Sequence, residues 1–550
     1  MKTLLTTLNA KYIHKALALR LLYNATKKEN DVIFKEFTIK DDIQKIVQEI
    51  LNLKVDIVSF SIYIWNINEI KEVIEQLKKI KPTIKIIVGG PEVSYEIDHF
   101  LDHFEIDYAM SGEGEETLNA LLKMIENNHF KSQPGISSKE ERNKSIAPLV
   151  PIDLLESLDS PYVLQEDLQD MDKRILYFET SRGCPYRCAY CLSSLEKGLR
   201  FYTIPYLENQ LEQILKTNVK TIKFLDRSFN ASTKHALAIL EIIKKMQRFD
   251  VSYQFEINGD VLDQKIIDFI HDFAPPGVIR FEIGIQSTYE PTNKIVQRYQ
   301  DFERLKEVIL QLQDKQIIDL HLDLIAGLPL ETKDRFAKSF DDVFNLYPKE
   351  LQLGFLKLLR GTSLRKNADQ YGYIYEQDAP YELIKGNDLS QDDIAQIHLA
   401  EDMLEKYWNS GKFNETMKKI KDNIDSPFNF FLDFGKFYQK NEYKKIHYQN
   451  DELFTYLQQY CLSIQMDVED ELIIDYLTIA RVKPKQWWQS RLNKNEYKPL
   501  IHKIIEKTEL NAQDLFKYSK IEVLRNHIVI AVYKNFNTKI YKLDKKSFIM

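Results

Sequence analysis

Short apolar runs alternate with amphipathic segments along residues 1–125. Five apolar runs predict strands, at residues 2–8, 32–38, 57–62, 84–88 and 108–110. The segments between them repeat apolar side chains at helical spacing, as in residues 16–26, 41–52 and 67–80. This alternation predicts an α/β domain with a doubly wound parallel sheet, Rossmann-like and flavodoxin-like. Ligands of such sheets bind outside the carboxyl ends of the strands.

The alternation of strand and helix returns at residue 173. The apolar runs predict strands at 175–178, 221–225, 252–257, 278–285, 318–326 and 350–358. Six such units predict a partial (β/α)6 barrel. Polar residues follow several of these strands, and in barrels that position indicates an active site.

Helical patterns replace this alternation beyond residue 380, as in residues 392–409 and 413–421. Alternating residues near the end predict a small terminal β element. The expected organisation is therefore a sheet domain, a linker, a barrel and a mainly helical accessory domain. Their boundaries are 1–135, 136–172, 173–380 and 381–550.

The composition is that of a soluble globular protein, with 44% hydrophobic and 29% charged residues. A net charge of −7 argues against a broad nucleic-acid interface, and no apolar run is long enough to span a membrane. The N-terminus lacks a secretory pattern, so we expect a cytoplasmic protein. Four cysteines are too few for a disulfide scaffold.

Three of the four cysteines lie in one short loop. Cys184, Cys188 and Cys191 have the spacing C-x3-C-x2-C, while Cys461 is distant. Grouped thiolates suit zinc or an iron–sulfur cluster, and three ligands leave a fourth position open for chemistry. A structural zinc knuckle, or a chance grouping, is the alternative interpretation.

This loop resembles the radical S-adenosylmethionine (SAM) superfamily, with Tyr190 at the aromatic position before the last cysteine. The resemblance implies a 4Fe-4S cluster on the three cysteines, with SAM on the open iron. It also implies reductive cleavage of SAM to a 5′-deoxyadenosyl radical.

The first domain resembles the cobalamin-binding domain that precedes many radical SAM barrels. In that family, small residues after the third and fourth strands line the pocket of the nucleotide tail. The resemblance therefore implies cobalamin-binding roles for Ser59, Ser61, Gly89, Gly90 and Pro91. The segment 111–115, Ser-Gly-Glu-Gly-Glu, also matches the family at the fifth strand.

One departure concerns the cobalt ligand. The Asp-x-His-x-x-Gly motif of classical cobalamin enzymes is absent, and His14 occupies the corresponding loop without that context. Many cobalamin-dependent radical SAM proteins also lack the motif, so the expectation is cobalamin without a protein histidine on cobalt. The alternative is a flavodoxin-like domain that has lost its cofactor.

The barrel strand ends match the SAM-binding pattern of the same family. The resemblance implies that Arg298 pairs with the SAM carboxylate, as a planar guanidinium suits that anion. The segment around Asp226 is expected at the SAM ammonium group. The expected SAM-binding residues are Asp226, Asn230, Glu256, Gln286, Ser287, Arg298 and Gly327.

Together these features predict a cobalamin-dependent radical SAM enzyme that methylates an unreactive carbon. The expected partners are a small-molecule or peptide substrate and a flavodoxin- or ferredoxin-type electron donor, with neither nucleic acid nor membrane. Radical rearrangement or cyclisation without methyl transfer is the main alternative. A transfer-RNA methylthiotransferase would need more cysteines in the first domain, and a non-catalytic cobalamin or redox sensor would not need the SAM-binding set.

Overall fold

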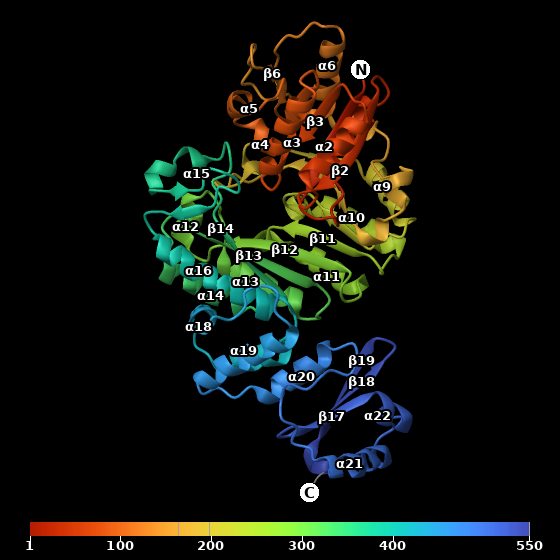
Figure 1. Ribbon diagram of the computed structural model, residues 1–550, viewed down its shortest axis with the longest axis vertical. Coiled ribbons are helices and arrows are strands. Elements are labelled where there is room, and N and C mark those ends of the chain that lie inside the picture. Colours follow the sequence, from red (N-terminus) through yellow and green to blue (C-terminus); the bar gives the residue numbers. More distant parts are fainter. Residues whose placement is uncertain (163, 197, 549–550) are drawn as a thin grey trace. The chain divides into compact units, whose positions relative to one another are not determined.

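The computed structural model describes residues 1–162, 164–196 and 198–548. These residues form two compact units, Met1–Ile394 and Ala395–Met550. The first unit contains both parallel sheets (Figure 1). The predicted sheet domain and barrel thus share one unit, and this unit ends later than the predicted boundary at residue 380.

The first sheet is doubly wound, as predicted, with the strand order β2-β1-β3-β4-β5-β6. Its parallel strands are β1 (Thr3–Asn9), β2 (Val32–Thr38), β3 (Ile57–Ser61), β4 (Lys85–Gly89) and β5 (Tyr108–Met110). A sixth strand, β6 (Ile136–Ser138), pairs antiparallel with β5. The segment predicted as a linker therefore begins with a strand of this sheet.

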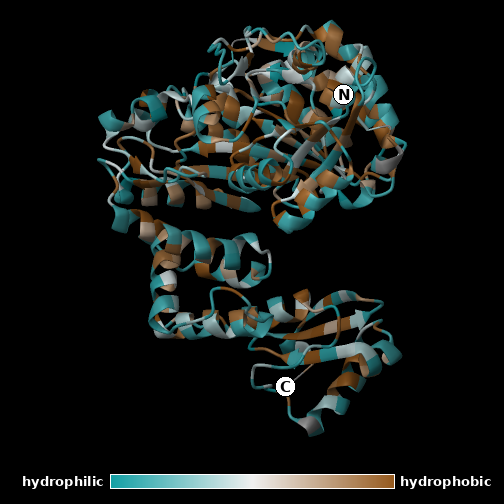
Figure 2. Cartoon of the chain, turned by 45° about the horizontal axis from the view of Figure 1, so that its top comes forward, coloured by the Kyte–Doolittle hydropathy of each residue, from teal (hydrophilic) through white to brown (hydrophobic). Residues whose placement is uncertain are grey.

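Helices cover both faces of the first sheet. The helices are α1 (Leu17–Thr26), α2 (Ile43–Asn52), α3 (Ile67–Ile80), α4 (Pro91–Ser94), α5 (Ile97–His103) and α6 (Gly114–Glu126). One buried apolar layer joins the sheet to α2, α3 and α5, and the other joins it to α1 and α6. Figure 2 shows these hydrophobic segments in brown, with hydrophilic residues on the outer helix surfaces. Burial on both faces explains why these strands are apolar throughout.

The second sheet has six parallel strands in the order β7-β10-β11-β12-β13-β14, which confirms the predicted partial barrel. The strands are β7 (Ile175–Phe178), β10 (Thr221–Phe224), β11 (Ser252–Ile257), β12 (Ile279–Gln286), β13 (Asp319–Ala326) and β14 (Glu350–Phe355). The helices that follow them are α9 (Ile204–Leu215), α10 (Thr233–Met246), α11 (Gln264–Phe273), α12 (Glu290–Ile295), α13 (Phe302–Gln313) and α14 (Lys333–Phe344). Along β10 and β11, alternate residues are buried and, except for Tyr253, apolar, and the polar residues between them are half-buried.

Smaller elements complete the first unit. They are α7 (Ile152–Glu156), α8 (Gln165–Leu168), β8 (Ser181–Gly183), β9 (Leu199–Phe201), α15 (Ser363–Lys366), β15 (Ile374–Tyr375) and β16 (Leu383–Lys385). Strands β8 and β9 pair antiparallel and form the stem of a hairpin. We call residues 181–201 the cysteine hairpin, because its loop contains Cys184, Cys188 and Cys191.

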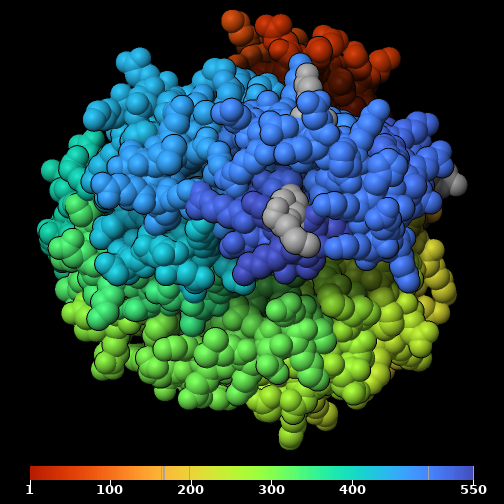
Figure 3. Space-filling model, turned by 90° about the horizontal axis from the view of Figure 1, so that it is seen from below, coloured from red at the N-terminus to blue at the C-terminus, as the bar shows by residue number. Residues whose placement is uncertain are grey.

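The second unit is mainly helical, as predicted. Its helices are α16 (Gln391–Leu404), which begins in the first unit, α17 (Asn414–Lys421), α18 (Pro427–Lys440), α19 (Asn450–Ser463), α20 (Glu469–Ile479), α21 (Lys494–Lys507) and α22 (Ala512–Tyr518). The predicted terminal β element is an antiparallel sheet of β17 (Ser519–Val523), β18 (His527–Lys534) and β19 (Asn537–Asp544). Figure 3 presents one face of this unit in blue. Aromatic residues of α18 and α19 pack on one another and form part of the core of this unit.

Among the described residues, no helix combines the length and the apolar character needed to cross a membrane.

Candidate functional site

The cysteine hairpin lies beside the barrel strand ends. Ala189, within its loop, donates its backbone N–H to Val296 O (2.8 Å) and accepts from Leu364 N (3.0 Å). All three cysteine thiols are free; Cys188 is buried, and Cys184 and Cys191 are half-buried. Backbone hydrogen bonds to Val296 and Leu364 therefore hold the loop in place, and its three thiols form no disulfide.

Two side chains next to Cys188 have special environments. The Arg298 Nη1 atom lies 3.9 Å from Cys188 Sγ, and its Nη2 donates to the carbonyl of Gly284. The Tyr190 hydroxyl is buried and has no hydrogen-bond partner among the described atoms. Burial raises the pKa of Tyr190. Arg298 therefore places a positive charge beside one of the three thiols.

The cysteine loop offers three sulfur donors for an iron–sulfur cluster. Among the described residues, no three His, Cys, Asp or Glu side chains already stand close enough to hold a metal ion. The donor set fits nevertheless, because three free thiols share one short loop. Burial raises the pKa of Cys184, and the other two thiols add to that increase. A bound cation would offset the mutual repulsion of the three thiolates.

Gln286 and Arg298 converge on the end of β12. Gln286 has a positive φ of 68°, which is unusual for a residue other than glycine, and its Oε1 is buried without a partner. A Cβ atom on Gly284 would lie 2.2 Å from Gln286 Nε2 and 3.9 Å from Arg298 Nη2. Unsatisfied polar atoms and backbone strain in one place are typical of ligand sites. Of these two, Arg298 also contacts the cysteine hairpin, at Cys188.

Three other predicted SAM residues are already bonded within the protein. Asp226 accepts hydrogen bonds from the Thr180 hydroxyl (2.6 Å) and the Ser181 hydroxyl (2.5 Å). The Asn230 amide bonds to both backbone groups of Asn258, at 2.8 and 2.9 Å. Ser287 is buried and donates to Glu331 Oε1 (2.6 Å). Each of these side chains joins two strand-end loops of the barrel.

The last two predicted SAM residues differ from each other. Glu256 lies on the polar side of β11; burial raises its pKa, while Arg227 and Lys223 oppose that increase. Gly327 has φ of 101°, and its carbonyl accepts from the Tyr373 hydroxyl (2.9 Å). A Cβ atom there would lie 2.5 Å from the end of the Leu383 side chain, but the positive φ is the main reason for glycine at this position.

The predicted cobalamin residues gather at the carboxyl edge of the first sheet. Ser61 on β3 pairs in register with Gly89 on β4, and Ser59 is also buried on β3. Pro91 is exposed and begins α4. Gly90 has φ of 106°, and a Cβ atom would lie 2.6 Å from Ile62 O. The small side chains at this edge fit the location where such sheets bind ligands.

Gly90 thus has a structural reason that the sequence did not reveal. The backbone of Ile62 crosses directly over it, and Ile62 N donates to Gly89 O (2.8 Å). The neighbouring loop therefore occupies the space that a side chain at residue 90 would need.

The carboxyl edge of the first sheet faces the barrel. His14, in the loop after β1, forms a bridge with Ile175 of β7, and its Nδ1 lies 2.7 Å from the Tyr177 hydroxyl. Burial lowers the pKa of His14, as do Lys11, Lys223 and Arg174. This histidine is therefore a contact between the sheet and the barrel.

Two groups of ion pairs also join the sheet to the barrel, and sequence reasoning assigned them no role. Arg360, after β14, contacts Glu92 (3.3 Å) and Glu96 of the α4–α5 region. Arg182 of the cysteine hairpin contacts Glu115 at the start of α6 (2.7 Å). Two features of the sequence could have indicated these ion pairs. They are the acidic motifs after β4 and β5 and the arginines that flank the barrel motifs.

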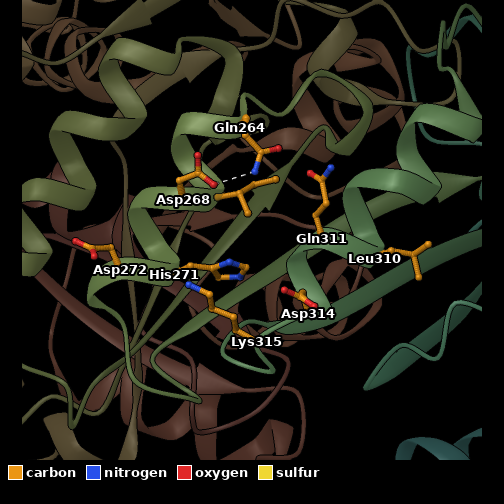
Figure 4. A pocket seen from close by; sticks show the side chains of 9 residues that line it. Gln264, Asp268, His271, Asp272, Leu310, Gln311, Asp314 and Lys315 are labelled. Atoms are coloured by element: carbon orange, nitrogen blue, oxygen red, sulfur yellow. Dashed lines mark hydrogen bonds between the residues drawn. The ribbon is translucent and has the colours of Figure 1, made fainter.

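A hollow of about 530 Å³ opens elsewhere, between α11 and α13 (Figure 4). Gln264 donates to Asp268 there (2.9 Å). His271 Nε2 and Gln311 Oε1 are buried without partners among the described atoms. None of the predicted site residues lines this hollow.

Comparisons with known proteins agree with this geometry. A sequence model described as the B12 binding domain matches residues 3–122, and one for the radical SAM superfamily matches residues 178–343. The chain thus contains a segment that matches the B12 binding domain, followed by a segment that matches the radical SAM superfamily. A third model, described as a protein of unknown function (DUF4080), matches residues 369–549.

Two curated relatives within this superfamily differ in the reaction that their names give. The cobalamin-dependent radical SAM methyltransferase TokK of Streptomyces tokunonensis is 26% identical over 310 residues, covering 52% of this chain and 44% of that protein. The anaerobic magnesium-protoporphyrin IX monomethyl ester cyclase of Rubrivivax gelatinosus is 24% identical over 329 residues, covering 56% of this chain and 58% of that protein. The chain thus spans about half the length of these relatives.

The fold of this radical SAM protein also matches a solved structure. The cobalamin-dependent S-adenosylmethionine radical enzyme OxsB, with aqua-cobalamin bound, aligns with a TM-score of 0.61 at 15% identity. The alignment covers 86% of this chain and 78% of OxsB. At this identity the likeness concerns the fold.

Proposed function

We propose that this protein is a cobalamin-dependent radical SAM enzyme that transfers a methyl group to an unreactive carbon of a small-molecule or peptide substrate. The observation that carries the proposal is the location of the cysteine hairpin. Its three free thiols lie at the strand ends of the barrel, in the same compact unit as the B12 binding domain. When bound, the cluster, SAM and cobalamin would supply reductive SAM cleavage and a transferable methyl group.

The residues of this chain would bind and orient those groups. Cys184, Cys188 and Cys191 would hold the cluster. Arg298, beside Cys188, would pair with an anionic group of SAM, and the unpartnered Gln286 carbonyl oxygen would accept a hydrogen bond. Glu256 and Gly327 are proposed at the periphery of the same ligand.

Asp226, Asn230 and Ser287 would act on SAM by fixing the strand-end loops, because their polar atoms are engaged in bonds to those loops. Ser59, Ser61, Gly89, Gly90 and Pro91 would shape the cobalamin pocket at the sheet edge. A flavodoxin- or ferredoxin-type protein would supply the electron. The four-part division at residues 135, 172 and 380 remains part of this proposal.

Product mass is the test of methyl transfer. The protein is reconstituted anaerobically with iron, sulfide and hydroxocobalamin, and then supplied with SAM, a reductant and an extract of small molecules and peptides. A product heavier by one methyl group, together with 5′-deoxyadenosine, supports the proposal. Omission of cobalamin is the control and should abolish the product.

Cyclisation without methyl transfer is the second candidate, because one relative bears the name of a cyclase. It predicts 5′-deoxyadenosine and a product that has lost hydrogen rather than gained a methyl group. Absence of any SAM cleavage by the iron-loaded protein would contradict both candidates.

A further inference from the structure

The cysteine hairpin has an unusual stem. Strands β8 and β9 pair over only three positions, and the central pair is Arg182 opposite Arg200. Like charges directly opposite each other destabilise an antiparallel pair. A short stem with two opposed guanidinium groups should therefore open readily unless a neighbouring anion offsets the charges.

The start of α6 supplies those anions. Glu113 Oε1 lies 3.4 Å from Arg182 Nη1, and Glu113 also contacts Arg200 Nη2. Glu115 Oε1 accepts from Arg182 Nη2 at 2.7 Å. Glu113 therefore stands between the two arginines, and Glu115 adds a second carboxylate. Both glutamates contact Arg182 across the boundary between the B12 binding domain and the barrel.

The geometry of these carboxylates is built into the first sheet. Glu113 is the N-cap residue of α6 and also accepts from the backbone N–H of Val150 (2.6 Å). Glu115 lies in the first helical turn and is 6% exposed. Negative side chains are favoured at a helix N-terminus, so the position of both glutamates on α6 suits their contacts with the arginines. Glu179, just before the hairpin, adds a further carboxylate that accepts from Arg182 Nε (3.0 Å).

We propose that Glu113 and Glu115 are positioning residues that hold the cysteine hairpin closed, by offsetting the repulsion between Arg182 and Arg200. The B12 binding domain thereby controls the order of the loop that carries the three cysteines. The meaning of that control for catalysis rests on the proposed function, whereas the hairpin closure itself does not.

Hydrogen exchange of the full-length protein without cofactors tests the closure. Backbone amides of β8 and β9 are followed by mass spectrometry in the variant Glu113→Gln/Glu115→Gln. We expect exchange about tenfold to a hundredfold faster than in the wild type, as charge-assisted bonds of partly buried groups are lost. Glu116→Gln is the matched control, since Glu116 is exposed on the same helical turn. Equal exchange in the double variant and the control would overturn the proposal.

A rescue experiment separates charge balance from a simple loss of packing. Arg182→Gln and Arg200→Gln are added to the double glutamate variant, which removes the repulsion itself. Exchange of the stem should then slow again by about tenfold, since no opposed charges remain. Equally fast exchange after the rescue would contradict the role of the arginine pair. Exchange of β12, in the same unit as the substitutions, verifies that each variant remains folded.

Iron uptake separates this inference from the proposed function. If the wild type binds iron, the carboxylate variant should bind it more slowly than the Glu116→Gln control during anaerobic reconstitution. If the wild type binds no iron while the exchange results hold, the proposed function fails and the positioning role stands. If iron uptake is identical in all variants and exchange is also unchanged, the positioning role fails.

Discussion

The Asp226 carboxylate follows β10 and is 2% exposed. It accepts hydrogen bonds from the chain segment that leads into the cysteine hairpin. Thr180 donates to it through its hydroxyl and its backbone N–H (3.2 Å), and the Thr180 hydroxyl lies 3.0 Å from His235 Nε2. Burial raises the pKa of Asp226 to about 6, although the hydrogen bonds from Ser181 and Thr180 oppose the increase. The ionisation of Asp226 therefore affects the free energy of unfolding.

The first prediction concerns this pKa. Because the folded pKa is raised, the folded state holds the proton more strongly than the unfolded state between about pH 4 and pH 6. The Asp226 contribution to stability is thus greatest below that window and is lost as pH rises through it, by about 2–3 kcal/mol. Asp226→Asn removes this titration. Its melting temperature, relative to that of the wild type, should rise from pH 4.5 to pH 7; the exposed Asp314→Asn control should show no such trend.

The second prediction concerns the thiols. Cys184→Ala, Cys188→Ala or Cys191→Ala should each remove most of the iron bound after anaerobic reconstitution, because each removes one of three ligands. Cys461→Ala is the control. Cys461 is fully buried on α19, and burial raises its pKa to about 12, so it remains a thiol. Iron content measured per chain decides the matter: iron lost from Cys461→Ala alone would refute the assignment.

At the scale of elements, the loops after β4 and β5 constrain each other. Gly90 carries a positive φ, Ser94 Oγ donates to Gly90 O (2.9 Å), and Gly112 N donates to Ser94 Oγ (3.0 Å). The loops after β4 and β5 are therefore linked. The shape of this sheet edge therefore depends on backbone contacts around Gly89 and Gly90.

The third prediction compares those glycines. Gly90→Ala places a Cβ atom 2.6 Å from a carbonyl oxygen in a backbone region that alanine avoids, and should destabilise the first unit by about 1–3 kcal/mol. Gly89→Ala meets the flexible end of Met110 at 3.3 Å and should cost much less. Thermal unfolding and hydroxocobalamin binding are measured on both. Equal melting temperatures for the two variants would refute the constraint, and unchanged affinity in both would refute the cobalamin site.

On the scale of the whole molecule, the B12 binding domain and the barrel form one compact unit. Arg360 is 4% exposed and Glu92 is 1% exposed, and the Tyr381 hydroxyl donates to Glu92 (2.8 Å). Burial raises the pKa of Glu92, while Tyr381 and Arg360 oppose that increase. Buried charges joined across a domain boundary fix its geometry, because separating them would leave each charge uncompensated.

The fourth prediction is that the two domains unfold together. Arg360→Met leaves Glu92 buried without its cation. It should lower the free energy of unfolding of residues 1–394 by about 3–5 kcal/mol. The transition of the second unit should not move. Differential scanning calorimetry resolves the two, and Lys173→Met, an exposed control on the same unit, should leave both unchanged. Three transitions in the wild type, rather than two, would contradict the cooperative unfolding of residues 1–394 as one unit.

Apolar periodicity in the sequence predicted both parallel sheets, the helical second unit and its terminal β element, because it reports directly on which faces are buried. The spacing of Cys184, Cys188 and Cys191 also predicted a group of thiols in one loop, because these residues are local in the chain. What each polar strand-end residue contacts became clear only from the three-dimensional structure. Asp226, Asn230 and Ser287 bond to other loops, and Glu113 meets Arg200 across 87 positions of sequence. Periodicity carries no information about such partners, because they depend on how separate elements meet in space.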